Sequence, residues 1–349
     1  MVGVLRALAS RAASLGLVLL VVITVLVAIL GASGFSEKVL TATINEELRN
    51  LRQSLAQRIT DPAELEAAIE TRRQELVSAY GLDKPWYYRL PDLIRRVILL
   101  DLGESRLIES FSGSRRVADI IAERIPFTVM LVTSATLIST LAGIYVGLRL
   151  ALNPGSKKDR LITYFAAISN GLPSWWTGII LMLVLVYYAR LLPPGGIMSS
   201  PPPTEPLMLV IDVLLHSILP IATLVTVSIG PAIYAVRTVV LNTAQEDFVD
   251  VARARGLPEG IVMRRHILRP AAPPIITIAV FSLAGSLGGA ILTETIFNWP
   301  GMGRLYYDSV VRGDEAIIVA LTYMYGLIYV GARLLLETLY IVLDPRVRY

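Results

Sequence analysis

The chain has 349 residues, of which 54% are hydrophobic and only 17% are charged, and its formal net charge is +4. Because a soluble domain averages about 25% charged residues, this composition argues against an ordinary soluble protein and favours one that crosses a membrane several times. The chain contains no cysteine, which excludes a disulfide framework and a thiolate metal site.

Six uncharged stretches divide the chain. They cover residues 12–35, 125–148, 161–189, 213–236, 270–293 and 316–332. A helix that spans a bilayer needs about 20 apolar residues, which the first five stretches supply. The sixth is shorter but continues to Leu343, and there Arg333 and Glu337 lie four residues apart on one helical face, where we interpret them as a structural pair. The sequence therefore predicts an all-α polytopic membrane protein with six transmembrane helices.

The first stretch is either a cleaved signal peptide or a retained helix. Arg6 and Arg11 precede it, as basic residues precede a signal peptide. Its apolar core, residues 15–30, is longer than the roughly 7 to 15 residues usual in such a segment. We therefore expect residues 1–35 to form a retained transmembrane helix.

The loops between the stretches predict the orientation, because short cytoplasmic loops carry an excess of lysine and arginine. The loop after the second stretch and the loop after the fourth are rich in basic residues, whereas those after the third and fifth carry one and two arginines. We expect both termini to be cytoplasmic in a prokaryotic plasma membrane. The domains would be residues 1–35, an extracytoplasmic segment at 36–124, a five-helix transmembrane domain at 125–343 with a cytoplasmic loop at about 241–269, and a cytoplasmic tail at 344–349.

The extracytoplasmic segment contains two amphipathic patterns. Apolar residues recur at helical spacing in both, at Ile44, Leu48, Leu51, Leu55 and Ile59 and then at Leu65, Ile69, Leu76 and Tyr80. Between the two patterns, Asp61 is placed to cap a helix whose first residue is Pro62, and Gly81 can end it. Residues Ile44–Tyr80 are therefore predicted to form a helical hairpin, either a lid over the outer mouth or an arm that docks a partner protein.

A basic segment, "DVARARGLPEGIVMRRH" at residues 250–266, interrupts the apolar stretches on the cytoplasmic side. Residues 241–255 have a helical pattern that ends at Gly256, a residue suited to the left-handed position after a helix. Pro258 suits the first turn of a second helix over 258–269, with Glu259 beside its positive end. The pattern predicts two short helices at the membrane surface, in which Ala252 and Ala254 allow close approach of another surface. An amphipathic segment held by lipid phosphates is the alternative.

"DVARARG", followed at a distance by "ILRP", resembles the EAA loop of bacterial and archaeal ABC importer permeases. Seven further stretches resemble the dipeptide/oligopeptide permease family, and in particular the first of its two permease subunits. They are "GLDKPWYYRL" at 81–90, "DLGES" at 101–105, "ERIPFT" at 123–128, "GLPSWW" at 171–176, "HSILP" at 216–220, "ETIFNWPGMGRL" at 294–305 and "LDPRVR" at 343–348. Residues 36–80 depart from the short segment usual in that family.

The resemblance implies that the basic segment is a coupling helix, which docks on an ATP-binding subunit and passes nucleotide-driven closure to the membrane helices. The coupling residues would be Asp250, Ala252, Ala254, Gly256, Leu257, Pro258, Arg264 and His266. The expected partners are a homologous second permease, two ATP-binding subunits, an extracytoplasmic substrate-binding protein and membrane lipid, but no nucleic acid. ATP and Mg would bind the partner subunits, because no phosphate-binding G-x-x-x-x-G-K-[ST] sequence occurs here. We expect no catalytic residue, cofactor or metal site in this chain.

Several polar and helix-breaking residues lie within the apolar stretches. Ser134, Thr136, Ser282 and Ser286 are candidates for lining a transport pathway, although serine and threonine in membrane helices also serve helix packing, for which "GSLGG" at 285–289 is well suited. Asp212 and His216 share a helical face, but two ligands do not make a metal site. Residues 171–173, Pro220 and residues 230–231 are expected to kink their helices.

The substrate is open between peptides and oligosaccharides, both of which similar systems carry. An ion-coupled secondary transporter is a rival class, but such a protein usually places ionisable residues deep in the membrane. Five of the six predicted spans have no Asp, Glu, Lys or Arg in their cores. A membrane-bound enzyme would need a convergent acid, base or metal cluster, and the sequence offers none.

Overall fold

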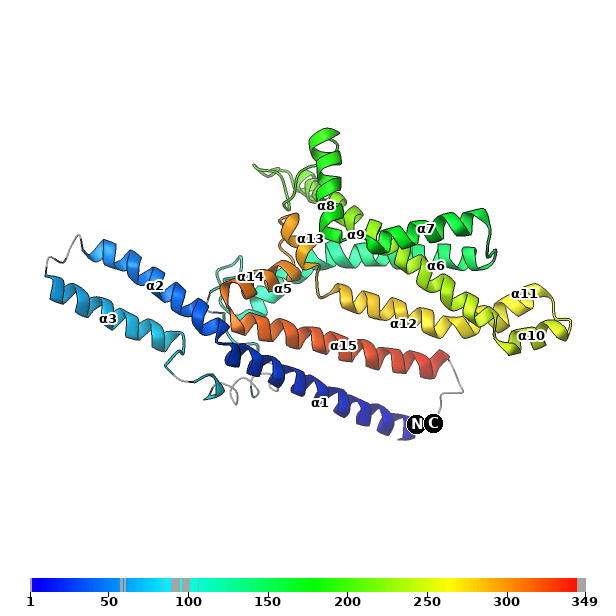
Figure 1. The fold of residues 1–349 in the computed structure, drawn as a ribbon, viewed down its shortest axis with the longest axis horizontal. Coiled ribbons are helices and arrows are strands. Elements are labelled where there is room, and N and C mark those ends of the chain that lie inside the picture. Colours follow the sequence, from blue (N-terminus) through cyan, green and yellow to red (C-terminus); the bar gives the residue numbers. More distant parts are fainter. Residues whose placement is uncertain are drawn as a thin grey trace. The chain divides into compact units, whose positions relative to one another are not determined.

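A computed structural model gives the fold and describes residues 2–56, 59, 61–83, 85–88, 95, 101–105 and 107–343 (Figure 1). These residues form helices and no strand, apart from one isolated antiparallel bridge between Glu104 and Arg116, so the all-α prediction is confirmed. The chain divides into two compact units. The first comprises residues 1–12, 124–305 and 327–349, and the second comprises residues 13–123 and 306–326. The predicted cytoplasmic tail, 344–349, lies outside the described residues.

Among the described residues, five helical segments are long and apolar enough to cross a membrane, and the chain is a multi-pass membrane protein. They are Ala13–Ser33 within α1 (Val2–Ser33), Val117–Ala151, Pro206–Ala244, Glu259–Ile296 and Glu315–Tyr340 within α15 (Glu315–Leu343). Val117–Ala151 comprises α5 (Val117–Thr128), the π-helical turn η2 (Val129–Thr133) and α6 (Ser134–Ala151). Each segment contains one of the uncharged stretches that predict a span, or most of it.

The remaining predicted span is broken. It consists of α7 (Lys157–Gly171) and then α8 (Ser174–Met182) with the π-helical turn η3 (Leu183–Tyr188), and the two parts bend by 98°. Leu172, with ψ 120°, is extended because it precedes Pro173, and a residue before proline is driven out of the helical conformation. The break predicted at residues 171–173 is therefore confirmed, and the count of spans is six if this bent pair is one of them.

α9 (Pro206–Ala244) is the central helix of the first unit, and small residues let its neighbours approach it closely. On α6, an added Cβ at Gly143 would lie 2.7 Å from Ala232 Cβ, and one at Gly147 would lie 2.8 Å from the Ile233 carbonyl oxygen. This Gly-x-x-x-Gly spacing is a recurrent helix-packing device in membranes. At residues 285–289, where the sequence predicts close packing, the prediction holds at Gly289, since an added Cβ would clash with Gly303 N, but is wrong at Gly285, where an added Cβ would meet open space.

α7 is fastened to α9 by a close contact and an ion pair. An added Cβ at Gly230 would lie 2.6 Å from Ser169 Oγ. Arg237 donates two hydrogen bonds to the buried Asp159 carboxylate, of 2.5 Å from Nε and 2.8 Å from Nη2. α9 itself continues without interruption through Pro220 and Pro231, and a kink at either proline stays a prediction.

The second unit contains the predicted helical hairpin. α2 (Phe35–Leu55) and α3 (Pro62–Ala79) lie side by side (Figure 1), and Ile44, Leu48, Ile69 and Leu76 form their buried core. The Asp61 carboxylate accepts a 2.9 Å hydrogen bond from Ala63 N, so the predicted cap is present. Gly81 ends α3 with φ +65°. The hairpin prediction is confirmed, although α2 begins well before the apolar pattern does.

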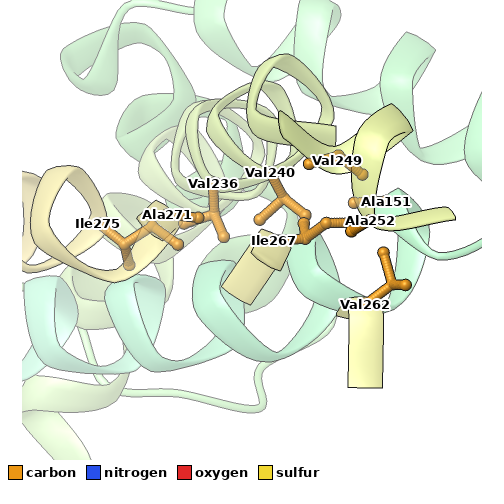
Figure 2. Packing of buried hydrophobic residues seen from close by; sticks show 9 residues of the cluster. All are labelled: Ala151, Val236, Val240, Val249, Ala252, Val262, Ile267, Ala271 and Ile275. Carbon is orange, nitrogen blue, oxygen red and sulfur yellow. The ribbon is translucent and has the colours of Figure 1, made fainter. Parts of the chain in front are cut away.

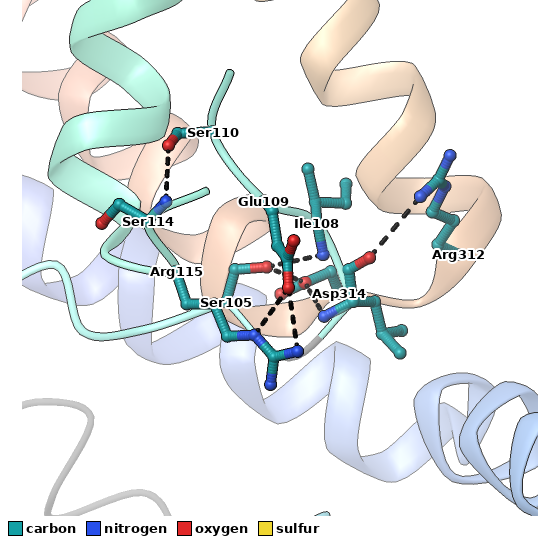
Figure 3. A network of polar contacts seen from close by, with 9 residues as sticks. Ser105, Ile108, Glu109, Ser110, Ser114, Arg115, Arg312 and Asp314 are labelled. Carbon is teal, nitrogen blue, oxygen red and sulfur yellow. Dashed lines mark hydrogen bonds and ion pairs between the residues drawn. The ribbon is translucent and has the colours of Figure 1, made fainter. Parts of the chain in front are cut away.

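The buried Asp314 organises the loop that leads into α5. Ser105 Oγ donates to Asp314 Oδ2 at 2.6 Å, and the Leu107 backbone N–H donates to the same oxygen at 3.1 Å (Figure 3). Asp314 directly precedes α15, and its Oδ1 accepts a weaker 3.5 Å bond from Ile317 N. The Asp314 side chain therefore joins Ser105 and Leu107 to the start of α15. α14 (Met302–Arg312) comes just before it, and η1 (Trp86–Tyr88) is a short 3-10 turn.

The predicted pair on α15 is present, with Arg333 Nε 3.6 Å from Glu337 Oε1. Since the arginine side chain is about half exposed, the pair contributes little to stability. We expect Glu337→Gln to lower the thermal midpoint of the purified protein by about 1–3 °C and to leave substrate preference unchanged. Differential scanning fluorimetry and a substrate panel measure the two quantities. A changed panel at unchanged stability would place the pair in the transport pathway.

Candidate functional site

The basic segment begins where α9 ends, at Ala244. Gln245 ends that helix, Glu246 is extended with ψ 142°, and α10 (Asp247–Ala254) starts directly after it. The prediction of one helix over residues 241–255 is therefore wrong, because a turn at Gln245 and Glu246 splits it. Asp247 and Asp250 lie in the first turn of α10, where negative charge favours the start of a helix.

Gly256 ends α10 with φ +75°, as predicted. Its N–H donates to the Arg253 carbonyl at 2.9 Å, and the Leu257 N–H donates to the Ala252 carbonyl at 3.4 Å. These are the two hydrogen bonds of a Schellman motif, which requires a left-handed residue at this position. The chain therefore turns sharply at Gly256 and Leu257 in a defined conformation.

The helix after the bend is longer than predicted. Pro258 is the residue before it, and α11 (Glu259–Ile261) passes through the π-helical turn η4 (Val262–Leu268) into α12 (Arg269–Ser286). The prediction of a separate short helix over 258–269 is wrong, because Pro270 does not end the helix. A proline lacks the N–H donor and its ring displaces a carbonyl of the preceding turn, and the wider π-helical turn provides the room. The bend thus connects α10 directly to the start of a spanning segment.

Arg253 spans the bend. Its Nη2 lies 3.1 Å from Glu259 Oε1, on the far side of the turn, and its Nη1 lies 3.5 Å from Asp250 on its own helix. The hydrogen bond to Glu259 and the charges of both carboxylates raise the pKa of the Arg253 guanidinium above its usual value. The pair is exposed, so its role is to favour one geometry of the turn rather than to supply much stability.

A hydrophobic core holds the inner face of α10 (Figure 2). Val249 and Ala252 of α10 are buried with Ala151 of α6, with Val236 and Val240 of α9, and with residues of η4 and α12. A displacement of α10 would have to carry these helices with it, because a close-packed core is not readily deformed.

The predicted coupling residues lie on α10, at the bend and on η4, and their side chains differ in solvent exposure. Asp250, Ala254, Gly256, Pro258 and Arg264 are exposed, Leu257 and His266 are half-buried, and Ala252 is buried. Ala252 therefore packs inside the chain, and the expectation that it admits another surface is wrong, because α10 turns that side toward its own core.

The outer face of the bend carries apolar side chains that the sequence reading missed. Phe248 is 44% exposed, Val251 is 50% exposed, and Ile261 on the other side of the turn is 40% exposed. Phe248 and Val251 are three residues apart and share a face of α10. Two apolar residues at this spacing in an otherwise charged helix could have predicted the exposed apolar face from the sequence. Exposed apolar residues rimmed by charge are typical of a protein-binding surface.

The four candidate pathway residues lie on two helices that contact each other. The Thr133 and Ser286 hydroxyls are 2.9 Å apart, and the Ser286 hydroxyl also donates to the Leu283 carbonyl. Ser286 is buried, Ser134 and Thr136 are half-buried, and Ser282 is exposed. Ser286 thus joins α12 to η2 within the chain. A pathway role for Ser134, Thr136, Ser282 and Ser286 stays a prediction.

Glu294, on α13 (Ile291–Ile296), is fully buried, and the sequence reading did not single it out. Its Oε1 accepts from Ala290 N at 3.1 Å and from Thr128 Oγ1 at 3.3 Å, and its Oε2 accepts from Arg304 N at 2.9 Å. Thr128 Oγ1 in turn accepts from Met302 N at 2.7 Å. Thr128 and Glu294 together therefore satisfy free N–H groups in the first turn of α14, which no residue of α14 can satisfy.

Asp212 anchors the connection before α9. It accepts hydrogen bonds from the N–H and the hydroxyl of Ser199, both of 2.7 Å, and His216 Nδ1 lies 2.8 Å from the Asp212 carbonyl oxygen. Among the residues that the structure describes, no three His, Asp or Glu side chains gather so as to hold a metal ion. The arrangement of Asp212 and His216 is that of a structural contact.

Residues 139–349 match the family model described as "Binding-protein-dependent transport system inner membrane component". The chain is 30% identical over 277 residues to the oligopeptide transport system permease protein AppB of Bacillus subtilis, covering 79% of this chain and 85% of that protein. It is 30% identical over 295 residues to the dipeptide transport system permease protein DppB of Escherichia coli, with coverage of 80% and 86%. It is 32% identical over 297 residues to the glutathione transport system permease protein GsiC of the same species, with coverage of 83% and 89%.

Proposed function

The chain belongs to the family of inner membrane components of binding-protein-dependent transport systems, and we propose that it forms one half of the membrane pathway of an ATP-driven importer of short peptides. The basic segment at α10 and α11 would be its coupling element, on the cytoplasmic side of a plasma membrane. A homologous permease, two ATP-binding subunits that hold ATP and Mg, and an extracytoplasmic substrate-binding protein would complete the complex.

The observation that carries the coupling role is the construction of α10. Its inner face is buried against α6, α9 and η4, whereas Phe248 and Val251 face outward. A partner bound to the outer face would therefore move α10 together with the adjoining ends of α6, α9 and η4 as a rigid body. ATP binding would close the ATPase subunits, draw the coupling helices together and open the pathway outward, and hydrolysis would reset it.

Substituting the outer face should weaken assembly with the ATP-binding subunits. We expect Phe248→Ser combined with Val251→Ser to reduce co-purification of those subunits about tenfold or more, since two apolar anchors would be lost from the interface. The measurement is the stoichiometry of subunits after affinity purification. Phe111→Ser is the matched control, because Phe111 is also exposed (59%) but lies in the loop before α5. Full association of the double variant would remove Phe248 and Val251 from the docking surface.

The proposed substrate class comes from the relatives, whose names specify oligopeptides, dipeptides and glutathione. The decisive experiment reconstitutes the whole complex in proteoliposomes and compares a peptide panel with an oligosaccharide panel. We expect peptides to stimulate ATP hydrolysis and to accumulate inside only when ATP is present. Stimulation by oligosaccharides alone would reassign the substrate, and uptake that follows an ion gradient without ATP would indicate a secondary transporter.

We propose that the α2–α3 hairpin, residues Ile44–Tyr80, is an arm that docks the substrate-binding protein on the extracytoplasmic side. Each helix uses its apolar stripe for the hairpin core, so its charged face is available to a partner. Replacing residues 44–80 with a short Gly/Ser linker should weaken binding-protein association, measured by surface plasmon resonance, while basal ATP hydrolysis continues. Unchanged affinity with a less stable complex would show that the hairpin is a lid instead.

A further inference from the structure

The second unit contains a polar cavity of about 780 Å³ between the hairpin and the loop before α5. Its charged lining residues are Glu47, Arg72, Asp101, Glu104, Arg115 and Arg116. The volume lies within the range of small-molecule sites, which is roughly 300–1,000 Å³. All of these residues lie outside 139–349, the part of the chain that matches the family model. The hairpin side of the cavity belongs to residues 36–80, which depart from the segment usual in the family, whereas Asp101 and Glu104 lie in the "DLGES" stretch that resembles it.

Two of the arginines in the lining already have partners. Arg72 pairs with Glu47 at 3.1 Å and with Glu75 at 3.0 Å. Arg115 pairs with Glu109 at 2.9 Å, and Figure 3 shows its guanidinium turned toward that carboxylate. These pairs shape the wall, but their charges are largely compensated.

Glu104 and Arg116 differ from those pairs. They face each other across the isolated antiparallel bridge, where opposite charges ordinarily pair. In the part of the chain that the structure describes, however, neither side chain makes a hydrogen bond or an ion pair, and both line the cavity. Asp101 also lines the cavity, and its Oδ1 accepts a 3.0 Å hydrogen bond from Gly103 N. Among the described residues, the cavity thus has an exposed guanidinium and an exposed carboxylate side by side, neither of which is paired.

We propose that this cavity binds a short peptide as a zwitterion, with Arg116 receiving its terminal carboxylate and Glu104 and Asp101 receiving its terminal ammonium. A guanidinium matches a carboxylate with two parallel hydrogen bonds. An extended dipeptide or tripeptide spans about 7–10 Å, which a cavity of this size accommodates. A single ligand that carries both charges can pair with Arg116 and with Glu104 and Asp101 at the same time.

Other small ligands fit the lining less well. An inorganic anion would meet three carboxylates in the same space, and an oligosaccharide would find only one aromatic ring, that of Tyr80, to stack on. The identification of the zwitterion as a peptide rests on the proposed function. The site would collect peptides at the extracytoplasmic face, apart from the substrate-binding protein.

The test uses the intact complex in lipid nanodiscs, without the binding protein, and trialanine as the probe in isothermal titration calorimetry. We expect trialanine to bind, and N-acetyl-trialanine amide, which lacks both charges, to bind at least about tenfold more weakly. Arg116→Gln and Glu104→Gln should each weaken trialanine binding about tenfold, because each removes a charge-assisted hydrogen bond. Arg73→Gln, the same substitution on an exposed arginine of α3 that does not line the cavity, should leave binding unchanged.

Three results would overturn the inference. These are no binding of trialanine, equal binding of the blocked peptide, and trialanine binding that the Arg116 and Glu104 substitutions leave unaltered. Weakened association of the binding protein in the variants, without any effect on trialanine, would assign the cavity to protein docking. ATP-driven peptide uptake by the complete system is measured separately, and its failure would reject the proposed function. Normal uptake together with no trialanine binding at the cavity would reject only this inference.

Discussion

Glu294→Leu should destabilise the protein by about 3 kcal/mol, because the substitution leaves the part-buried backbone N–H groups of Ala290 and Arg304 without their acceptor. It also removes the acceptor for the Thr128 hydroxyl. Each of these hydrogen bonds would be lost, and a donor shielded from water without a partner loses its hydration as well. The measurement is thermal and denaturant unfolding of the purified protein in one detergent.

The neighbouring glycines give an independent variant. An added Cβ at Gly301 would lie 2.5 Å from Glu294 Oε2, so Gly301→Ala should push the carboxylate from its donors and destabilise the protein in the same direction. Glu205→Leu is the control, since Glu205 is an exposed glutamate that precedes a helix but makes no capping bond with its side chain. Equal stability of Glu294→Leu and the unaltered protein would mean that water satisfies the same N–H groups.

Glu294 also illustrates what the sequence could not reveal. Its donors come from α5, from the turn before α13 and from the start of α14, which meet only in the folded chain. In the sequence, Glu294 lies at the end of an apolar stretch, where a charged residue is ordinary. The Gly143 and Gly147 contact was missed for a related reason, since glycine spacing alone does not tell which helix will lie opposite.

Features set by a few consecutive residues were predictable. The apolar stretches, the break before Pro173 and the Gly81 and Gly256 helix ends all follow from local rules, and the structure has them. The errors occurred where a local rule competes with packing. Residues 241–255 have a continuous helical pattern but turn at Gln245, because a straight helix could not bring Val249 and Ala252 back onto the core of α9 and η4.

Gly256→Val should uncouple ATP hydrolysis from transport, with uptake falling about tenfold or more while the spanning helices still insert. At φ +75° a residue with a Cβ is strained, and a β-branched residue is a rare outlier there. Space is not the obstacle, since an added Cβ would meet nothing within 4 Å. The variant would therefore lose the Schellman turn and change the angle between α10 and α11. The measurement compares ATP hydrolysis with peptide uptake in reconstituted complexes of verified subunit stoichiometry.

Gly260→Val provides the matched control four residues away. Gly260 lies in α11 with no positive φ, and an added Cβ there also meets nothing within 4 Å. The same side chain is thus introduced into the same exposed segment without backbone strain, and its transport should stay near that of the unaltered complex. If both variants fail equally, added bulk at the docking surface is the cause. If Gly256→Val transports normally, the bend does not transmit closure, and the core beneath α10 would have to carry the motion without it.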